Sequence, residues 1–289
     1  MTDRRPEPPF PEQHLDKPGL ESELRPRPRY EAPPYTGADK LADRVALITG
    51  GDSGIGRAVA VLFAREGADL ALVYLPAEQS DAEETLVAVE SEGRRAELIP
   101  GDVRDPGFCR EAVERTVQAL GRLDILVNNA AYQQHREGLA DLDEEQWDVT
   151  LKTNVYGYFY MSRAALGYLP PGGTIINSGS IVGLEGRPRL IDYGTSKGAI
   201  HAFTKSLALD LVDRGIRVNC VAPGPVWTPL NPADRDAEEI PEFGAGTPMG
   251  RPAQPEEIAP AYVFFASPAD SGFISGEVLT ILGGATRAG

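Results

Sequence analysis

From residue 43 onward, short apolar runs alternate with amphipathic segments of helix length, and this alternation restricts the fold more than any other feature of the sequence. The runs at 45–48 and 125–127 are apolar at every position, which is typical of strands buried on both faces of a sheet. Strands that alternate with helices predict a parallel sheet covered by those helices. We therefore expect one α/β domain over residues 43–289, built on a doubly wound parallel sheet.

The same pattern sets the expected boundaries of the elements. Strands are expected at 45–48, 70–74, 97–99, 125–127, 174–177, 217–221 and 278–281. Helices are expected at 56–66, 81–92, 106–120, across 144–169, at 193–214 and at 255–266. Open sheets of this kind bind their ligands at the carboxyl ends of the strands, near the point where the strand order reverses. The functional residues are therefore expected at that edge.

Residues 1–42 differ from the rest, because prolines recur among charges of both signs. Such a stretch cannot sustain helical or ladder hydrogen bonds, so we expect an extended N-terminal arm. It is either a flexible tail or a strap that lies over its own domain or a neighbouring subunit. In the second case four apolar side chains would anchor it: Phe10, Leu15, Leu20 and Tyr30.

Composition argues against several classes of function. The formal net charge of −15 disfavours binding to nucleic acid or to an anionic membrane surface. Cys109 and Cys220 are too few for a disulfide framework, and His14, His135 and His201 are too widely spaced to suggest a metal site. There is no apolar run of the roughly 18–20 residues that cross a bilayer, and the charged start lacks the apolar core of a signal peptide. We expect a cytoplasmic protein without a metal.

A glycine-rich turn, Thr49 to Gly56 (TGGDSGIG), directly follows the first expected strand. Glycines let the chain reverse and let a pyrophosphate approach the backbone, and the following helix offers free N–H groups and the positive end of its dipole. A plain tight turn would contain similar glycines, but the position between a strand and a helix favours dinucleotide binding. The expected cofactor contacts in the turn are Gly50, Asp52, Ser53, Gly54, Ile55 and Gly56.

A second motif places Tyr193 four residues before Lys197 in an expected helix. Residues at this spacing share one face, so the phenol and the ammonium can reach the same cavity. A free tyrosine has a pKa of about 10, and a nearby lysine cation favours the phenolate and makes it a better acid–base catalyst. Alone the pair is weak evidence, because a Tyr–Lys pair on an exposed helix has the same spacing.

Taken together, these motifs resemble the short-chain dehydrogenase/reductase family from about residue 40 to the C-terminus. The glycine spacing G-x-x-x-G-x-G after Thr49 matches the cofactor turn of that family. The other matching motifs follow in the family's order: Asn128-Asn129-Ala130, Asn154, Ser180, Tyr193, Lys197 and Pro223-Gly224. Ala131 departs from the family's glycine, a change between small residues that we expect to matter little. The resemblance implies a Rossmann-like fold and an NAD(P)-dependent oxidoreductase.

The resemblance also implies roles for individual residues. Tyr193 would give or take the proton of the reacting oxygen, Ser180 would hold that oxygen, and Lys197 would act on Tyr193 and bind the nicotinamide ribose. Asn154 would hold a water in a proton relay to the lysine. Ser178, also near the end of an expected strand, competes for the role of Ser180. The remaining cofactor contacts would be Tyr74, Asp102, Val103, Asn129, Ala130, Pro223, Gly224, Val226 and Thr228.

The choice between NAD and NADP depends on the end of the second expected strand. An acid there would bind a ribose 2′-hydroxyl and repel a 2′-phosphate, but the position is occupied by Tyr74. The turn contains Asp52 and Ser53 where a basic residue would favour a 2′-phosphate. Because Glu78 and Asp81 add further acids nearby, the sequence leans weakly toward NAD.

The segments outside the motifs bear on the substrate. Residues 227–251 are polar and rich in proline and glycine, which is typical of an active-site lid. The acidic residues of this segment are expected on a solvent-exposed face of the lid rather than in a metal site: Asp234, Asp236, Glu238 and Glu239. The polar residues 132–135 favour a small oxygenated substrate such as an aldehyde, sugar or polyol. The alternatives are a 3-oxoacyl reductase and a non-catalytic dinucleotide-binding regulator. Within the family, the chain most resembles bacterial stress-protein-like and glucose–ribitol dehydrogenase-like members.

The expected helix at 155–169 is apolar or aromatic around most of its circumference, which is more than one sheet-facing stripe requires. Residues 199–211 are similarly broad. Burial against a second copy explains both, and the family commonly assembles through these helices. We therefore expect a homodimer or a homotetramer.

Overall fold

A seven-stranded sheet forms the centre of the protein, and each strand runs parallel to its neighbours. The computed structural model describes residues 5–286. Across the sheet the strands follow the order β3 (Ala96–Pro100), β2 (Asp69–Tyr74), β1 (Val45–Thr49), β4 (Ile125–Asn128), β5 (Thr174–Ser178), β6 (Arg217–Pro223) and β7 (Val278–Ile281). The order reverses between β1 and β4, which confirms the doubly wound, Rossmann-like sheet.

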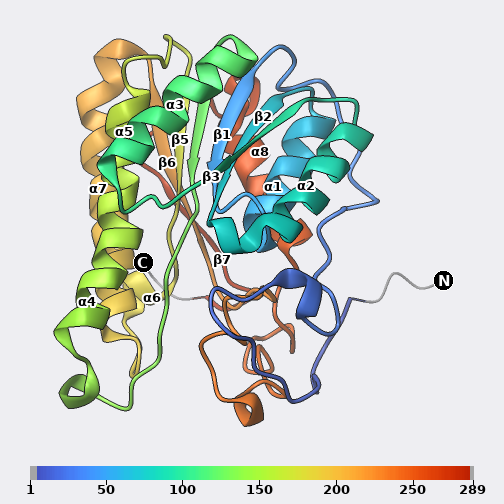
Figure 1. Cartoon of the computed structure of the whole chain (residues 1–289), viewed down its shortest axis with the longest axis vertical. Helices are drawn as coiled ribbons and strands as arrows, with labels where there is room; N and C mark the ends of the chain where they lie inside the picture. Colours follow the sequence, from blue (N-terminus) through green and yellow to red (C-terminus); the bar gives the residue numbers. More distant parts are fainter. Residues whose placement is uncertain (1–4, 287–289) are drawn as a thin grey trace.

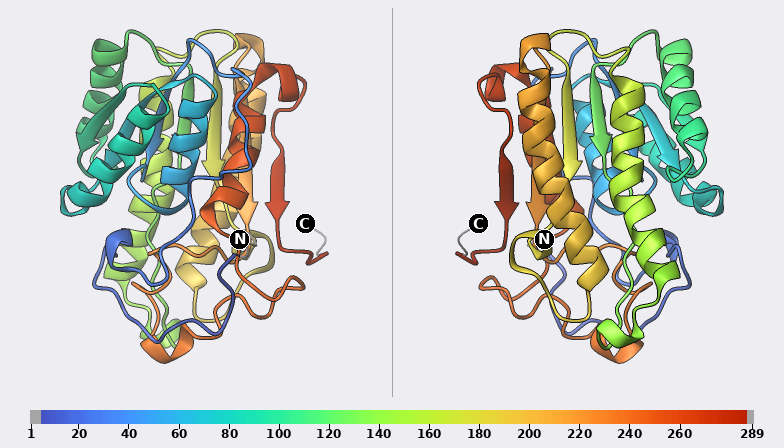
Figure 2. Two further views of the ribbon diagram at one scale, coloured as in Figure 1. Left: turned by 90° about the vertical axis from the view of Figure 1, so that its right-hand side faces the viewer. Right: turned by 90° about the vertical axis from the view of Figure 1, so that its left-hand side faces the viewer.

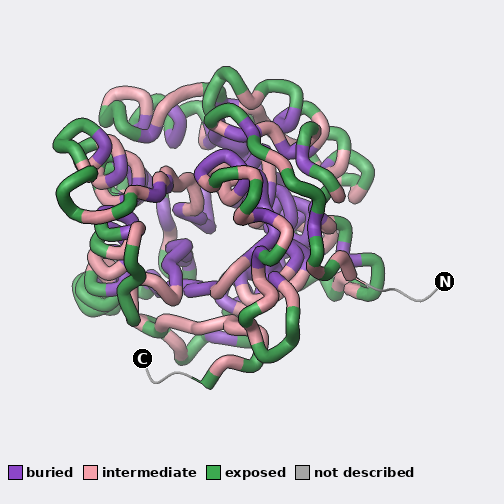
Figure 3. Tube along the Cα trace, turned by 90° about the horizontal axis from the view of Figure 1, so that it is seen from below, coloured by how far each residue is buried: buried purple, intermediate pink, exposed green. Residues whose placement is uncertain are grey.

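Helices cover both faces of this sheet (Figures 1 and 2). One face packs against α1 (Gly54–Arg65), α2 (Gln79–Ser91) and α8 (Pro255–Ala266). The other packs against α3 (Pro106–Leu120), α5 (Gly157–Ala165) and α7 (Ile191–Leu211). Every residue of β1, β2, β4, β5 and β6 is buried, and the buried positions of the chain gather inside the molecule (Figure 3). The apolar runs therefore have the two-sided burial that their sequence predicts.

The expected strands and helices are all present, and most of their bounds lie within two residues of the observed ones. β7 and α8 have the predicted bounds, whereas α1 begins at Gly54 and α7 begins at Ile191. The expected helix at 193–214 is α7 followed by a separate 3₁₀ turn, which Gly215 ends in the left-handed region at φ 67°. The remaining helical segments are α4 (Glu144–Leu151), η4 (Lys152–Tyr156), α6 (Val182–Glu185), α9 (Pro268–Ser271), η1 (Glu21–Glu23), η2 (Pro76–Glu78), η3 (Leu139–Asp141), η5 (Val212–Arg214) and η6 (Ala237–Glu239). Within residues 5–286, no helix combines the length and apolar character that a bilayer crossing requires.

The arm lies against its own domain from residue 5 to residue 42. It passes beneath the carboxyl edge of the sheet beside the segment that follows β6, and then rises along the side of the molecule to β1 (Figures 1 and 2). The Phe10 ring stacks on Trp227 with centroids 4.0 Å apart, and Leu15 and Leu24 are buried in the same cluster. Leu20 and Tyr30 are half-buried. The arm therefore has the course of a strap over its own domain.

A buried ion pair fixes the middle of the arm to the glycine turn. The Glu21 carboxylate lies 2.8 Å from the Arg57 guanidinium, and both side chains are 0% exposed. The other Glu21 oxygen accepts a hydrogen bond of 2.6 Å from the Gly54 N–H, the first residue of α1. In return, Asp81 accepts the backbone N–H groups of Glu21 and Ser22 at 2.6 and 3.2 Å. The arm thus satisfies a helix N-terminus and a buried cation together.

Replacing Glu21 with alanine removes the closest carboxylate partner of the buried Arg57. Arg57 then keeps only the carboxylates of Glu84 and Asp81, 3.3 and 3.8 Å away, and the Gly54 N–H loses its acceptor. Removing one partner of a buried pair costs about 3 kcal/mol, which raises the population with an undocked arm by about a hundredfold. We expect protease cleavage within residues 5–42 to accelerate by about the same factor, because cleavage follows the open population. Glu12→Ala, which removes an exposed carboxylate of the same arm, is the matched control. Equal cleavage of the two variants would contradict the anchoring role of Glu21.

Candidate active site

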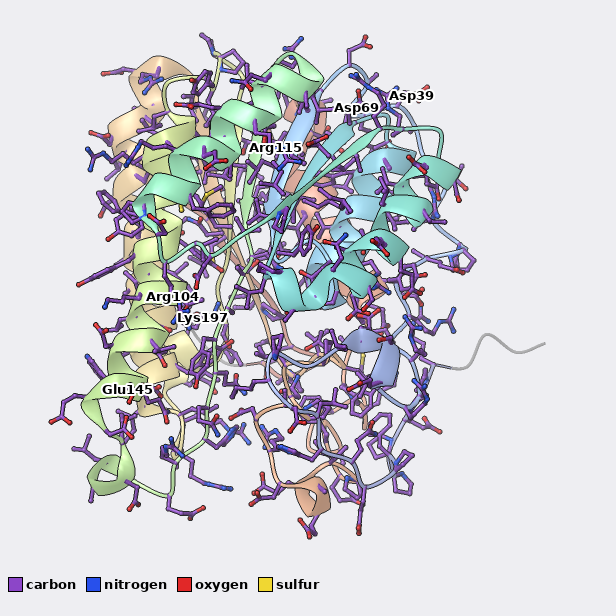
Figure 4. The ribbon with its side chains drawn as sticks, viewed as in Figure 1. Asp39, Asp69, Arg104, Arg115, Glu145 and Lys197 are labelled. Atoms are coloured by element: carbon purple, nitrogen blue, oxygen red, sulfur yellow. The ribbon has the colours of Figure 1, made fainter. Side chains whose placement is uncertain are left out.

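A cavity of about 1160 Å³ opens at the carboxyl edge of the sheet, where the strand order reverses. It brings together residues that are far apart in the sequence and that the sequence predicted for one site. Of the predicted residues, those that line it are Gly50, Asp52, Ser53, Gly54, Ile55, Tyr74, Asp102, Val103, Asn129, Ala130, Ser180, Tyr193, Lys197, Pro223, Gly224, Val226 and Thr228. Gly56 and Asn154 do not line it. Figure 4 shows Lys197 and Arg104 toward this end of the molecule and Asp69 at the opposite end.

The glycine turn has the backbone geometry that its sequence predicts. Gly50 and Gly54 adopt the left-handed region, with φ of 62° and 51°. A Cβ on Gly56 would lie 1.8 Å from the Gly50 carbonyl oxygen, so Gly56 permits α1 to pack closely on the turn. This explains why Gly56 does not face the cavity although the motif requires it.

Hydrogen bonds join the turn to the ends of β4 and β5. The Thr49 hydroxyl oxygen accepts the backbone N–H groups of Asn129 and Ala130 at 2.9 and 3.1 Å. The Asn129 amide donates to the Gly50 carbonyl at 3.1 Å, and its carbonyl oxygen accepts from the Ser178 hydroxyl at 3.1 Å. The Asn-Asn-Ala motif therefore joins the glycine turn after β1 to the ends of β4 and β5, across the switch point.

One end of the cavity is acidic and has the features of a ribose site. Burial raises the pKa of Asp52 to about 6, and burial together with the Asp52 charge raises the pKa of Glu78 to about 8. The Asp52 Oδ2 atom is buried without a hydrogen-bond partner among residues 5–286, and it suits a hydroxyl donor of a ribose. Tyr74 donates its hydroxyl to Gln79 at 2.6 Å, and Asp102 accepts from Arg104 at 2.8 Å. The close-approach glycines and this unpaired acceptor fit a dinucleotide.

Tyr193 and Lys197 lie in the first two turns of α7, at the other end of the cavity. The Lys197 ammonium lies 5.4 Å from the Tyr193 ring centroid and donates to the Ser178 carbonyl oxygen at 2.7 Å. Burial lowers the pKa of Lys197 to about 8. Burial also raises the pKa of Tyr193, while a hydrogen bond with Ser180 lowers it. The Tyr193 pKa therefore shifts in the direction opposite to the lowering expected from the lysine, because desolvation is the largest cause.

The two candidate serines have different surroundings. The Ser178 hydroxyl lies 2.6 Å from the Tyr262 hydroxyl and also donates to Asn129, so it is engaged inside the protein. Both serines line the cavity, but the Ser180 hydroxyl is the one that is hydrogen-bonded to Tyr193. This arrangement favours Ser180 as the group that meets a substrate oxygen.

Asn154 is buried beside the site in η4, a π-helical turn within an otherwise α-helical segment. Such turns re-aim side chains and are frequent at functional sites. The Asn154 carbonyl oxygen accepts the Tyr132 N–H at 2.7 Å, and its amide donates to the Tyr132 carbonyl and to the Ser196 hydroxyl, both at 2.9 Å. Asn154 therefore orders the loop after β4 and its contact with α7.

Residues 227–251, which the sequence predicts to form an active-site lid, pack against the N-terminal arm. Trp227 is 0% exposed and its indole N–H donates to the Pro26 carbonyl at 2.9 Å. The prediction of a solvated face is wrong for Asp234, which is 5% exposed. Its carboxylate accepts hydrogen bonds from His135 and Gln133 in the loop after β4, and these bonds offset the cost of burial. Across residues 5–286, no three His, Cys, Asp or Glu side chains form a group able to hold a metal ion.

The structure also adds cavity residues that the sequence analysis missed. They come from the arm and from the loop before α7: Lys17, Pro18, Gly19, Arg187, Arg189 and Leu190. Their positions depend on how distant segments pack. No local motif or periodicity marks them, so sequence patterns alone carry no signal for them.

His201 supports the Ser180 loop and provides a test of the packing. Its Nε2 atom accepts the Ser180 backbone N–H at 3.4 Å, which requires the unprotonated ring nitrogen. Burial, followed by the charges of Lys197 and Lys205, lowers the pKa of His201 to about 4.

Between about pH 6.5 and about pH 4, His201 is protonated in the unfolded chain but not in the folded protein. The free energy of unfolding therefore falls as the pH drops through this window. Across this window, we expect the free energy of unfolding of wild type to decrease by about 1–2 kcal/mol more than that of His201→Gln; this figure is reduced for solvent screening. Urea unfolding at several pH values measures the difference, with His14→Gln as the exposed-histidine control. Parallel curves for wild type and His201→Gln would refute the prediction.

Comparisons with known proteins agree with this geometry. A sequence profile of the family described as enoyl-(acyl carrier protein) reductase matches residues 50–286. General stress protein 39 of Bacillus subtilis is 55% identical over 268 residues, which are 93% of this chain and 93% of that protein. Glucose and ribitol dehydrogenase of Daucus carota is 46% identical over 280 residues, 95% of this chain and 96% of that protein.

A solved structure is similar over most of the chain. The short-chain dehydrogenase from Burkholderia cenocepacia J2315, in complex with NADP, has a TM-score of 0.78 at 36% identity, and the match covers 85% of this chain and 98% of that chain. The profile, the relatives and this structure confirm the resemblance seen in the motifs. The chain belongs to the short-chain dehydrogenase/reductase family of NAD(P)-dependent oxidoreductases.

Proposed function

We propose that this enzyme interconverts small carbonyl compounds and alcohols, with Tyr193 as the acid–base group. One observation carries the proposal: Tyr193, Ser180 and Lys197 meet in the same cavity that the glycine turn lines. A site that only bound a dinucleotide would have no need of this second group. The non-catalytic regulator is therefore the weaker alternative.

Each residue of the site has a separate role in the proposed reaction. NAD(P), when bound, supplies or accepts the hydride at the carbonyl carbon. The Tyr193 hydroxyl gives the proton to the carbonyl oxygen during reduction and takes it back during oxidation. The Ser180 hydroxyl donates a hydrogen bond to the same oxygen and stabilises its developing negative charge. Lys197, held by the Ser178 carbonyl, places a cation beside the phenol and would bind the nicotinamide ribose.

Asn154 would act through its neighbours. Its hydrogen bonds to Tyr132 and Ser196 keep the loop after β4 at a fixed distance from α7. A water relay from this asparagine to Lys197 remains part of the proposal. A variant at Asn154 would therefore change proton transfer and the shape of the substrate end together.

The proposed substrate is a small aldehyde, sugar or polyol. The polar residues at the substrate end and the name of the carrot relative, glucose and ribitol dehydrogenase, favour this class. A 3-oxoacyl reductase is the alternative within enzymes, and the chain's net charge of −15 disfavours docking of an acidic carrier protein. We propose NAD(P) as the cofactor without a choice between the two forms. The Burkholderia structure contains NADP, so the weak lean toward NAD has no support from it.

We also propose that a second copy covers the outer faces of α5 and α7. Phe159 and Leu209 on these helices, and Tyr156 and Val212 in the adjoining η4 and η5, remain 43%, 80%, 46% and 61% exposed. Sedimentation equilibrium should give a dimer or a tetramer, and Leu209→Asp should shift it toward the monomer. A monomeric wild type at micromolar concentration would contradict this assembly.

Replacing Tyr193 with phenylalanine removes the proton donor and leaves the glycine turn intact. We expect turnover of small aldehydes to fall by at least about a thousandfold, at the middle of the range for a general acid, while the cofactor still binds. Loss of reduced-nicotinamide absorbance measures turnover, with NADH and NADPH run side by side.

Tyr168→Phe is the matched control, because Tyr168 is 43% exposed and lies outside the cavity. Turnover retained by Tyr193→Phe would exclude the acid–base role. Cofactor binding without turnover of any carbonyl compound by wild type would favour the regulator.

A further inference from the structure

Charged side chains of both signs line the cavity. The carboxyl groups of Asp52, Glu78 and Asp102 belong to the glycine turn and to the segments after β2 and β3, and Asp102 is paired with Arg104. Four cations come from the arm, the loop before α7 and the segment after β6: Lys17, Arg187, Arg189 and Arg235. Glu185, Glu239 and Glu242 line the cavity as well, so the cations that matter for a ligand are those without a carboxylate partner.

Lys17 reaches the cavity from the arm and is held at its backbone and at its tip. The neighbouring Leu15 N–H donates to the Pro232 carbonyl at 3.2 Å, and Gly19 packs against Pro229 and Ala233 so closely that a Cβ would lie 2.9 Å from the Ala233 Cβ. The Lys17 ammonium donates to the Gln133 carbonyl at 2.6 Å. It also lies 4.6 Å from the centroid of the Tyr132 ring. These contacts position the ammonium beside the loop that leads from β4.

The Lys17 side chain is incompletely paired. Within residues 5–286 no carboxylate lies within ion-pair distance of it, although burial lowers its pKa and the Asp234 charge raises it. The carbonyl of Gln133 uses one of its three N–H donors. The side chain retains exposed surface, and that surface lines the cavity. Two donors of a fixed cation are thus left for a ligand.

The three arginines among these cations are not equivalent. Arg189 pairs with Glu137 at 3.0 Å and also with Glu239, and Arg235 lies 3.4 Å from Glu239. Arg187 is exposed to the cavity, and its guanidinium has no partner in the described part of the chain. Of these four cations, Lys17 and Arg187 are therefore the two without a carboxylate partner in the described part of the chain.

We propose that Lys17, supplied by the N-terminal arm, and Arg187 bind an anionic group of the substrate, so that the preferred carbonyl compounds carry a carboxylate or a phosphate. This proposal rests on the proposed oxidoreductase function and names its substrate class. Charge-assisted hydrogen bonds from a fixed ammonium and a guanidinium suit either anion. The arm is then a specificity-determining wall of the site.

Two pairs of aldehydes test the proposal with the full-length enzyme. Butyraldehyde and succinic semialdehyde differ by a carboxylate at the same chain length, and glyceraldehyde and its 3-phosphate differ by a phosphate. We expect wild type to show a kcat/KM at least about tenfold higher for the anionic member of one pair, mainly through a lower KM. The pair with the larger ratio identifies the anion.

Lys17→Gln and Arg187→Gln should each lower this anionic-to-neutral ratio by about tenfold, while Lys17→Arg should retain most of it. Lys40→Gln removes a cation from the same N-terminal segment, at a surface ion pair with Asp270 outside the cavity, and should leave the ratio unchanged. Turnover of aldehydes without an anionic preference, or a ratio unaffected by Lys17→Gln, would overturn this inference alone. Cofactor binding with no turnover of any aldehyde would instead overturn the proposed function.

Discussion

The structure depends on a parallel sheet that is buried on both faces. β1, β4 and β5 are buried along their length, and their polar residues, such as Thr49, Asn128 and Asn177, stand at or near the strand ends, so polar chemistry is confined to those ends. The Thr49 hydroxyl then joins the turn after β1 to the backbone after β4. One edge of the sheet therefore holds the glycine turn and the Tyr193 group in a fixed relation, and open α/β sheets generally bind their ligands at this edge.

The arm extends this edge into an enclosed site. The buried pair of Glu21 and Arg57 fixes it at the glycine turn, and the Phe10–Trp227 stack fixes it under the segment after β6. Between these anchors the chain brings Lys17 to the loop after β4. An arm that is ordered before a ligand arrives loses little conformational entropy on binding, so its contacts can contribute to specificity.

The sequence predicts the features that depend on local pattern. The strands follow from continuous apolar runs, the phosphate turn from glycines between a strand and a helix, and the shared face of Tyr193 and Lys197 from their spacing. Contacts between distant segments leave no such pattern. Lys17 meets Gln133 across 116 residues, and Asp234 is buried because His135 and Gln133 satisfy it. The rise of the Tyr193 pKa likewise depends on burial that only the packed fold produces.

Isotope transfer tests the central claim most directly, because it follows the reacting hydrogen itself. Wild-type enzyme would be given butyraldehyde and reduced nicotinamide cofactor carrying two deuterium atoms at C4, and the product alcohol would be analysed by mass spectrometry. We expect one deuterium at the former carbonyl carbon and an exchangeable solvent proton on the oxygen. An alcohol without deuterium, or no alcohol from an enzyme that binds the cofactor, would contradict hydride transfer to a carbonyl at this edge of the sheet.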